Sequence, residues 1–523
     1  MAESYDAVVV GAGINGLACA VHLAHKGWRV AVFEGAAEPG GAVKSGAYTL
    51  PGFTHDWAAM NLSLFAGSAF FRKHGKTLEH HGLAFAPASD CFASVFPDGR
   101  WLGVSTDIAA TQARLAAISP EDAAAWGRLA KAFPGEAATL FALLGSPMSI
   151  RALASFMFKT LRARGVAGSL DLTRFLLASP RRWLDETFAA DETKALLAAW
   201  GMHLDFAPDT AGGAVFPYLE GMANQAFGMV IARGGAGMLT EALVRALRAK
   251  GGTIACNAPV ARILHKGRRA QGVELADGRT VMATRAVIAN TAPAGLMRLT
   301  GGTGAAPFDA AMRAFDHAPG TMMIHLALSG PPDWTAGAAL KRFAYVHIAP
   351  SLDQMARTYT QARAGLLPDA PVLVVGQPTA IDPSRAPEGQ HTLWLQVRMA
   401  PGTIRGDAAG RITATDWADA AGPFAERALS ILEDHAPGMR ARILARRIVT
   451  PAELEADNPN LVGGDQITGS HHLAQNFAFR PARGHADGTT PIEGLYLTGA
   501  AVWPGAGTGA GSGFLLAQKL AGS

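Results

Sequence analysis

Changes in the spacing of apolar residues divide this chain into strands and helices. The run from Ala7 to Val10 is continuously apolar, which predicts a buried strand, and a second such run extends from Val30 to Glu34. Between them, apolar residues recur at helical spacing from Gly16 to Lys26, and Gly27 ends the helix. Two apolar strands joined by a helix predict a βαβ unit, which opens a parallel sheet.

Helical spacing then dominates residues 77–225, where Ser119 and Pro120 mark one capped helix start. Residues 226–300 begin with an amphipathic helix and continue as short β-rich runs, with a hairpin turn at Asp277-Gly278. Residues 301–470 mix strand-like runs such as TMMIHLALSG, PVLVVGQPTA and HTLWLQVRMA with one clear helix. The alternation predicts an α/β protein with a second, α+β unit.

The composition excludes several classes of protein. A chain of 523 residues, 49% hydrophobic and 17% charged, is long enough for two or more packed units. Its net charge of +4 is spread along the sequence and gives no basic footprint for nucleic acid. The three cysteines form no CxxC pair, so we expect no disulfide framework, redox dithiol or thiolate metal site. Redox chemistry would therefore require a bound cofactor.

The sequence gives no sign of a secretory or membrane-spanning segment. The N-terminus lacks a basic region followed by an apolar core, and no apolar run reaches the ~18 residues that a spanning helix needs. Residues 148–164 are both amphipathic and basic. This helix either docks on anionic lipid or packs on the protein core. We expect a cytoplasmic protein that is at most peripheral to a membrane.

The loop after the first strand has the spacing of a dinucleotide-binding motif. Gly11 allows a tight turn, Gly13 lets the backbone approach a pyrophosphate, and Gly16 permits close helix packing. The remaining loop residues are Ala12, Ile14 and Asn15. Glu34, at the end of the second strand, can accept hydrogen bonds from a ribose. These features predict dinucleotide binding but do not separate FAD from NAD.

A second glycine pair, Gly40 and Gly41, follows soon after Glu34. A nicotinamide dehydrogenase would normally continue here into another crossover helix. A second glycine turn directed at the same cofactor is typical of flavoproteins that bind a long FAD molecule. The spacing therefore favours FAD.

Four stretches carry a family resemblance: the first 35 residues of the βαβ unit and its second glycine turn, IARGGAGMLTEALVRALRAKGG, APEGQHTLWLQ and GLYLTGAAVWPGAGTGAGSG. The chain resembles the phytoene desaturase superfamily of FAD-dependent oxidoreductases. Within it, the likeness is to the branch with desaturase-like β-carotene ketolases and pyridine nucleotide-disulfide oxidoreductase domain-containing protein 2. The resemblance implies a two-domain α/β flavoprotein of the amine oxidase/desaturase type, with a Rossmann-like FAD domain and an α+β substrate domain.

The resemblance also implies how the chain is divided. Residues 1–76, 226–300 and 471–523 would form the FAD-binding domain, 77–225 a largely helical substrate or cap region, and 301–470 the α+β substrate domain. The residues expected against FAD are Gly11, Ala12, Gly13, Ile14, Asn15, Gly16, Glu34, Gly40, Gly41, Ala42, Val260, Gly499 and Ala500. Many relatives have Arg where this chain has Ala42, so another residue such as Lys44 would supply the cationic contact.

The C-terminal stretch is predicted to contact the same cofactor a second time. A strand at 495–497 leads to Gly499 and Ala500, and a helix beginning near Gly511 can direct its N–H groups at the pyrophosphate or the flavin ring. The two ends of the chain would then meet at FAD.

Several residues are candidates for the substrate side. The resemblance puts Trp57, Met60 and Asn61 beneath the flavin ring, and we add Gly235, His203 and Trp503; His55, His325 and His472 are further polar candidates. Each of these has an ordinary structural interpretation as well. No catalytic residue is assigned, because hydride transfer to a flavin needs little acid/base machinery. The pair His471 and His472 lacks a third ligand, so we predict no metal.

These observations lead to one main hypothesis and two alternatives. The main hypothesis is an FAD-dependent oxidoreductase, similar to desaturases, saturases or ketolases, that transfers hydride between flavin and a C–C bond of a lipophilic, isoprenoid-like substrate in a largely apolar tunnel. One alternative is an amine or amino-acid oxidase of the same fold, which would need an aromatic cage and a polar anchor. The other is a flavin-bound regulatory or assembly protein with a membrane or respiratory partner. The sequence leaves the oligomeric state open.

Overall fold

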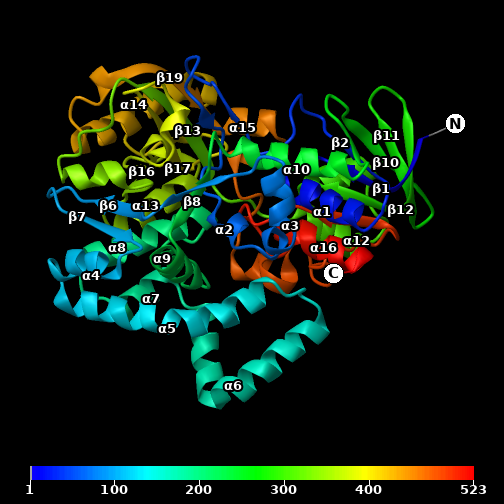
Figure 1. The fold of residues 1–523 in the computed structure, drawn as a ribbon, viewed down its shortest axis with the longest axis horizontal. Helices are drawn as coiled ribbons and strands as arrows, with labels where there is room; N and C mark the ends of the chain where they lie inside the picture. Colours follow the sequence, from blue (N-terminus) through cyan, green and yellow to red (C-terminus); the bar gives the residue numbers. More distant parts are fainter. Residues whose placement is uncertain (1–2, 523) are drawn as a thin grey trace.

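The computed structural model describes residues 3–522 and contains two large sheets, one at each end of the molecule (Figure 1). The first sheet has the strand order β10-β11-β12-β1-β2-β9, and β20 pairs with the C-terminal end of β12. Its strands are β1 (Glu3–Val10), β2 (Val30–Phe33), β9 (Thr253–Ala255), β10 (Val260–Lys266), β11 (Arg269–Leu275), β12 (Thr280–Asn290) and β20 (Leu495–Thr498). The pairs around β1, β2, β9 and β20 are parallel, whereas β10, β11 and β12 are antiparallel.

Three distant parts of the chain therefore meet in one sheet. β12 pairs with β1 from the N-terminal segment and with β20 from the C-terminal one. The helices α1 (Ile14–His25), α10 (Gly237–Ala249) and α16 (Gly511–Ala521) pack side by side on one face (Figure 1). Helices α11 (Pro293–Thr300) and α12 (Ala306–Arg313) contribute to the core on the other face. The domain boundaries at 76, 225, 300 and 470 stay predictions.

Helix α1 begins two residues before the position expected from the apolar spacing. Gly13 is its N-cap in an extended conformation, and no side chain caps the first turn. The helix ends at His25, and Gly27 follows with φ of 81°. The first N–H groups of α1 are thus left without a side-chain partner, and they point out of the sheet's carboxyl edge.

The second sheet has seven strands in the order β19-β13-β17-β16-β14-β6-β7. They are β6 (Asp90–Val95), β7 (Trp101–Ser105), β13 (Gly320–Leu328), β14 (Tyr345–Ile348), β16 (Val372–Gly376), β17 (His391–Ala400) and β19 (Ile443–Val449). β13 and β17 are buried on both faces, with α14 (Trp417–His435) packed against one face. All three strand-like runs singled out in the sequence form strands here.

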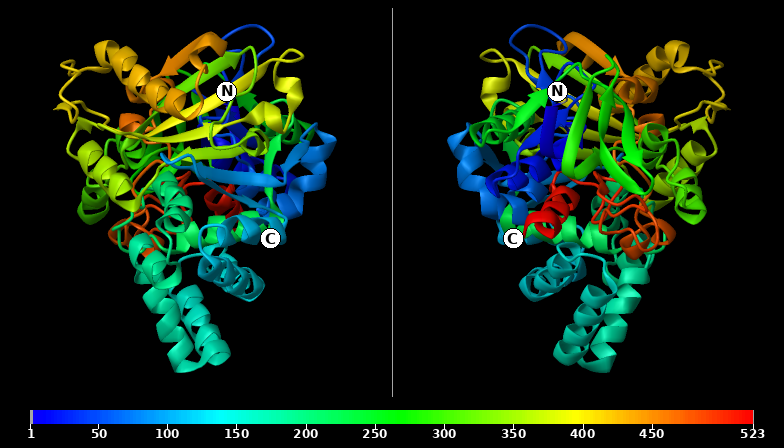
Figure 2. Two further views of the ribbon diagram at one scale, coloured as in Figure 1. Left: turned by 90° about the vertical axis from the view of Figure 1, so that its left-hand side faces the viewer. Right: turned by 90° about the vertical axis from the view of Figure 1, so that its right-hand side faces the viewer.

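The middle of the chain is largely helical. Its helices are α4 (Ile108–Ala116), α5 (Pro120–Leu144), α6 (Ile150–Leu177), α7 (Pro180–Thr187), α8 (Asp191–Gly201) and α9 (Val215–Phe227). The Ser119 hydroxyl accepts a hydrogen bond from Asp122 N, so the expected cap is present. Helix α6 breaks at Gly165, and its two arms form a V that projects from the body of the molecule (Figures 1 and 2).

The strands β6 and β7 also come from this region, although its periodicity indicated helix. Each is only five or six residues long, and a short apolar run does not distinguish strand from helix. The smaller elements are α2 (Ser63–Ala66), α3 (Ala69–His80), α13 (Leu352–Arg363), α15 (Pro451–Asp457), β3 (Ser45–Gly46), β4 (His55–Asp56), β5 (Phe85–Ala88), β8 (Met229–Ala232), β15 (Leu366–Leu367) and β18 (Gly406–Asp407).

Candidate FAD and substrate site

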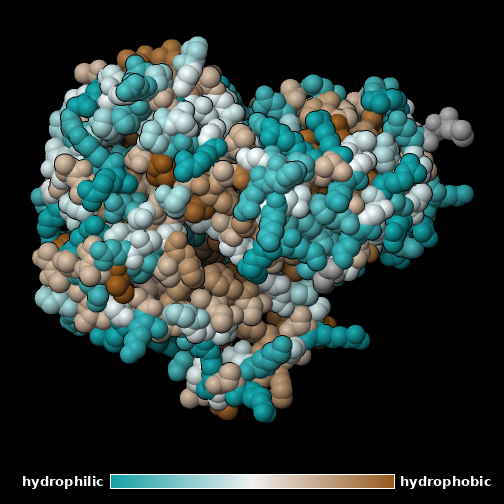
Figure 3. Space-filling view, in the orientation of Figure 1, coloured by the Kyte–Doolittle hydropathy of each residue, from teal (hydrophilic) through white to brown (hydrophobic). Residues whose placement is uncertain are grey.

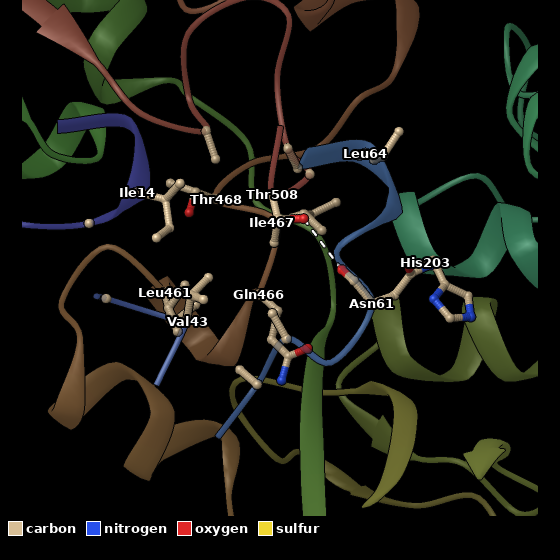
Figure 4. Close-up of a pocket in the computed structure, with 18 of the residues that line it drawn as sticks. Ile14, Val43, Asn61, Leu64, His203, Leu461, Gln466, Ile467, Thr468 and Thr508 are labelled. Carbon is tan, nitrogen blue, oxygen red and sulfur yellow. Dashed lines mark hydrogen bonds between the residues drawn. The ribbon is translucent and has the colours of Figure 1, made fainter. Parts of the chain in front are cut away.

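A cavity lies where the glycine loops of the first sheet face the second sheet. It encloses about 1330 Å³ of empty space, the solvent at its open side included. Ile14, Asn61, His203 and Gln466 surround this space (Figure 4). Leu64 of α2 and Phe216 of α9 also line it, and the surface is hollowed between these two helices (Figure 3). The cavity thus joins elements of both sheets.

Asn290, the last residue of β12, is the point on which the glycine loops converge. A Cβ atom on Gly11 would lie 3.0 Å from Asn290 O, and one on Gly13 would lie 2.9 Å from Asn290 Nδ2. Gly499 has φ of 117°, and a Cβ there would lie 3.1 Å from Asn290 Oδ1. Only glycine allows these two distant backbone segments to approach one residue this closely. Asn290 lines the cavity and was not predicted, because nothing marks it beyond its place after the run RAVIA.

Two helix N-termini meet at the same place. Asn15 Oδ1, in the first turn of α1, accepts hydrogen bonds from Ser512 Oγ at 2.9 Å and Gly513 N at 3.3 Å, both in the first turn of α16. Each helix carries partial positive charge at its N-terminus and leaves N–H groups free to bind an anion. The pair therefore fits the pyrophosphate of a dinucleotide.

The second glycine turn lies directly against the first. Gly40 and Gly13 form an isolated parallel bridge, and a Cβ on Gly41 would lie 3.4 Å from the Gly13 Cα atom. Glu34 accepts hydrogen bonds from Ala12 N at 2.7 Å and Ala36 N at 2.9 Å, which fixes its carboxylate beside the loop. This glycine cradle, with an acid at one end and helix N-termini in the middle, fits FAD.

The predicted site residues divide into two groups. Those that line the cavity are Gly13, Ile14, Asn15, Gly40, Gly41, Ala42, Met60, Asn61, His203, Gly499 and Ala500. Those that do not are Gly11, Ala12, Gly16, Glu34, Val260, Trp57, Gly235 and Trp503. Ala258 N donates to Glu34 O, so the strand that begins at Val260 starts next to the acid. The contacts of all these residues with FAD or substrate stay predictions.

Three substrate candidates lie away from the cavity for clear reasons. The Trp57 ring packs between Tyr48 and His325. The backbone of Gly235 is pressed against Ser45, where a Cβ would lie 2.6 Å from the serine Oγ atom. The indole N–H of Trp503 donates to Ser146 O. Each of these residues is buried in a packed interface. From the sequence alone, such a residue cannot be distinguished from one that contacts a ligand.

Lys44, the suggested replacement for the missing arginine, is already paired with a carboxylate of the protein. Its Nζ atom lies 2.7 Å from both carboxylate oxygens of Asp457. Among the described residues, Arg398 on β17 is the one Lys or Arg that lines the cavity. The sequence contains a signal for it: Trp394, Gln396 and Arg398 place polar groups at alternate positions of an otherwise apolar strand.

The wall away from the glycine loops is aromatic and partly polar. Tyr345 and Trp394 are stacked at 5.7 Å between ring centroids, and Trp200 lies 6.0 Å from Tyr345. Glu220 of α9 lines the same space, and burial raises the pKa of its carboxyl to about 7. The cavity is therefore less apolar than the tunnel expected from the sequence.

Of the histidine candidates, His203 lines the cavity and the other three do not. Burial lowers the pKa of His203 well below its usual value, and its Nε2 atom lies 3.3 Å from His347 Nε2. His55 and His325 form a buried pair outside the cavity, and His472 lies beside Asp205 and Tyr359. Within residues 3–522, no group of three or more His, Cys, Asp or Glu side chains is arranged to hold a metal ion.

Replacing Glu220 by glutamine is expected to flatten the pH dependence of stability. Since burial raises the folded-state pKa from 4.5 to about 7, the folded protein holds a proton that the unfolded chain loses. Stability then falls as pH rises from about 4.5 to about 7, by about 3 kcal/mol, and the variant lacks this fall. Unfolding free energies measured across that pH range test this, with the exposed Glu79→Gln as a control. An unchanged slope in the variant would refute the assignment.

A βαβ dinucleotide unit, a second glycine turn and a C-terminal glycine loop around one cavity define an FAD-dependent oxidoreductase. The chain belongs to the family described as flavin containing amine oxidoreductase, whose sequence profile matches residues 14–416. It is 28% identical to the rat protein named pyridine nucleotide-disulfide oxidoreductase domain-containing protein 2, over 96% of this chain and 91% of that protein. It is also 28% identical to all-trans-zeta-carotene desaturase of Myxococcus xanthus, over 96% and 90% of the two chains.

The solved structures support the fold. A crystal structure of an oxidoreductase from Methanosarcina mazei matches with a TM-score of 0.62 and 18% identity, over 98% of this chain and 99% of that one. The expected two-domain flavoprotein fold, the FAD cofactor and the assignment as an oxidoreductase are confirmed. No helix within residues 3–522 is long and apolar enough to cross a bilayer.

Proposed function

We propose that this enzyme oxidises or reduces a C–C bond in a lipophilic substrate, in the manner of the carotenoid desaturases it resembles. The observation that supports this best is that the FAD cradle opens directly into a deep cavity between the two sheets. The similarity to a protein named as a zeta-carotene desaturase, over 96% of the chain, points to the same class of reaction. FAD, when bound, accepts or donates the hydride.

The chain's own residues would bind FAD, orient the substrate and shield the reacting centre from water. The first turns of α1 and α16 would hold the pyrophosphate, and Glu34 would hold the ribose. Thr508 Oγ1 donates to Asn61 O at 3.4 Å, so the C-terminal loop closes over the segment that contains Met60 (Figure 4). This closure would exclude water from the reacting centre, which favours hydride transfer.

Anaerobic mixing of the FAD-loaded protein with candidate substrates tests this function. Polyenes and other isoprenoids are expected to change the redox state of the flavin, seen as loss or recovery of its visible absorbance, and the product should differ by one double bond. Reduction by polyamines with none by isoprenoids would overturn the proposal.

One observation favours a second candidate, an amine oxidase. Trp200, Tyr345 and Trp394 present aromatic rings to the cavity beside the carboxyl group of Glu220. Aromatic faces and a carboxylate together bind ammonium groups. In that case Glu220→Gln would abolish turnover of amines, whereas turnover of an isoprenoid hydrocarbon would be unaffected by the lost charge.

We also propose that the V-shaped arm formed by α6 attaches the enzyme to an anionic membrane. The arm exposes large apolar side chains to a degree that is rare on a protein surface: Ile150 (87%), Met157 (68%), Phe158 (67%), Val166 (67%) and Leu170 (64%). Helix α6 contains five basic residues and one acidic residue. Exposed Arg151, Lys159 and Arg162 belong to none of the described ion pairs and lie along one edge of the apolar stripe.

Vesicle sedimentation tests this attachment. The protein is expected to bind vesicles that contain phosphatidylglycerol and to bind pure phosphatidylcholine weakly. Replacing Met157, Phe158 and Leu161 by serine should remove most of the binding, and replacing the three unpaired cations by glutamine should remove its lipid selectivity. Phe227→Ser is the control, because Phe227 is 70% exposed but lies outside the arm. If the serine variant instead converts a dimer to a monomer, a second copy of the chain covers the arm and the membrane proposal fails.

A further inference from the structure

Arg398 differs from the other fully buried arginines in what surrounds its charge. Arg385 is paired with Asp56 and Asp382, and Arg480 is surrounded by backbone carbonyls, four of which accept its hydrogen bonds. Arg398 is 5% exposed and lines the cavity, and none of the described carboxylates lies within ion-pair distance of it. Asp205 and Asp465 act on Arg398 only at longer range, so a ligand can supply the close anion that a buried cation usually has.

Three hydrogen bonds hold the guanidinium in place and leave part of its N–H groups unused. Nη1 donates to Thr321 Oγ1, and Nη2 donates to the carbonyl oxygens of Met202 and His203, each at 2.9 Å. Its Nε atom is buried and has no partner among the described residues. Burial lowers the pKa of Arg398 to about 10, so the group keeps its charge at neutral pH.

The backbone next to Arg398 is strained in a way that aims this side chain. The pairing of β13 with β17 shifts between Gly320 and Thr321, which leaves Met399 unpaired with φ of 60°. A bulge of this kind costs free energy and redirects the neighbouring side chain. Strain of this kind clusters at binding sites, and here it adjoins the one cationic residue of the described cavity wall.

Three further unpartnered groups of the cavity wall are also hydrogen-bond donors that cannot accept. Trp200 Nε1, Trp394 Nε1 and Gln466 Nε2 are buried, line the cavity and lack a described acceptor. Together with Arg398 Nε they are four N–H groups, which can only donate; the remaining unpartnered atom of the wall is the hydroxyl of Thr291. A wall of unpartnered donors fits a ligand that brings acceptor oxygens.

We propose that Arg398 binds a carboxylate on the substrate, so that the enzyme acts on an apolar chain with an acid group, such as a fatty or isoprenoid acid. This inference rests on the proposed function, because it names the substrate class for that cavity. A single cation suits a monoanionic carboxylate better than a phosphate dianion, which is usually bound by several cations. Glu220 is compatible with this ligand, since a nearby anion favours its protonated, hydrogen-bond-donating form.

Binding of three matched probes to the FAD-loaded protein tests the proposal. Decanoate, decanol and decylamine share one chain and differ only in the head group. Calorimetric titration is expected to show decanoate binding at least 10-fold more tightly than the other two. Arg398→Gln should weaken decanoate by about 30-fold and leave decanol nearly unchanged.

Two milder variants cover the case in which Arg398→Gln does not fold. Trp200→Phe and Trp394→Phe keep the aromatic rings and remove only the N–H groups, and at least one should weaken decanoate by about 3-fold to 10-fold. Trp334→Phe is the matched control, because the Trp334 N–H already donates to Gln377 Oε1 and the residue does not line the cavity.

Three results would overturn the proposal: equal affinity for the three probes, tightest binding of decylamine, or decanoate binding that none of these cavity variants changes. These outcomes are separate from failure of the proposed function, because the titration measures binding alone. Suppose that the protein binds decanoate through Arg398 but that no isoprenoid changes the redox state of its flavin. The proposed function would then be disproved, whereas the carboxylate site would be supported.

Discussion

A chain in which alanine replaces Gly513 is expected to purify without bound FAD. The Cβ atom of the alanine would overlap the backbone oxygen of Asn15, and a backbone atom cannot rotate away as a side chain can. Helix α16 would have to separate from α1, which breaks the paired N-termini that fit the pyrophosphate. FAD occupancy, measured from the ratio of flavin to protein absorbance, should fall to roughly a tenth or less, which corresponds to at least ~1.4 kcal/mol of lost binding.

The matched control for this variant is Gly422→Ala in α14. A Cβ at Gly422 meets no atom within 4 Å, so this alanine should leave FAD occupancy unchanged and stabilise the helix slightly. A chain that ends at Gly499 lacks α16 altogether and should also lose FAD. If Gly513→Ala retains full flavin occupancy, the C-terminal helix has no part in holding the cofactor.

The second large effect is expected at Arg385, where replacement by methionine should destabilise the protein by roughly 3–5 kcal/mol. Arg385 Nη1 lies 2.5 Å from Asp56 Oδ2, and both side chains are fully buried. Nη2 donates to Ala232 O, and the other oxygen of Asp56 accepts from Ala236 N. Loss of the cation leaves two buried carboxylates, those of Asp56 and Asp382, without their charged partner, and that desolvation cost is the main source of the effect.

Chemical unfolding measures this loss, and two further variants define its origin. Arg262→Met removes an exposed ion pair with Glu274 and should cost less than about 1 kcal/mol. Adding Asp56→Asn to Arg385→Met should restore part of the stability, because it removes one of the two unpaired charges. A cost below about 1 kcal/mol for Arg385→Met would show that the buried pair does not stabilise the fold.

The sequence predicts the parts of this fold whose signals are local. Gly11, Gly13 and Gly16 have a fixed spacing between a strand and a helix, so the βαβ unit follows from the first 35 residues. The strand predicted at 495–497 and the helix predicted to begin near Gly511 are present as β20, which is one residue longer, and α16.

What the sequence could not predict depends on pairing between distant segments. Asn290 matters because glycines from two distant segments pack around it, and no residue near it in sequence indicates this. Trp503 and Trp57 resembled site residues, yet packing against Ser146 and His325 turns them away from the cavity. Arg398 reaches the cavity through a bulge whose position is set by the pairing of β13 with β17. Register of this kind is decided by long-range contacts.

The pairing of β20 with β12 also sets the order of events when the protein is made. Chains fold from the N-terminus as the ribosome releases them, and the glycine cradle includes Gly499, Ser512 and Gly513, which are made long after the βαβ unit. The βαβ unit can form early, but the cradle around it stays incomplete until β20 and α16 have been made. If this cradle holds FAD as proposed, a ribosome that stalls before β20 would leave a chain that excess flavin cannot rescue.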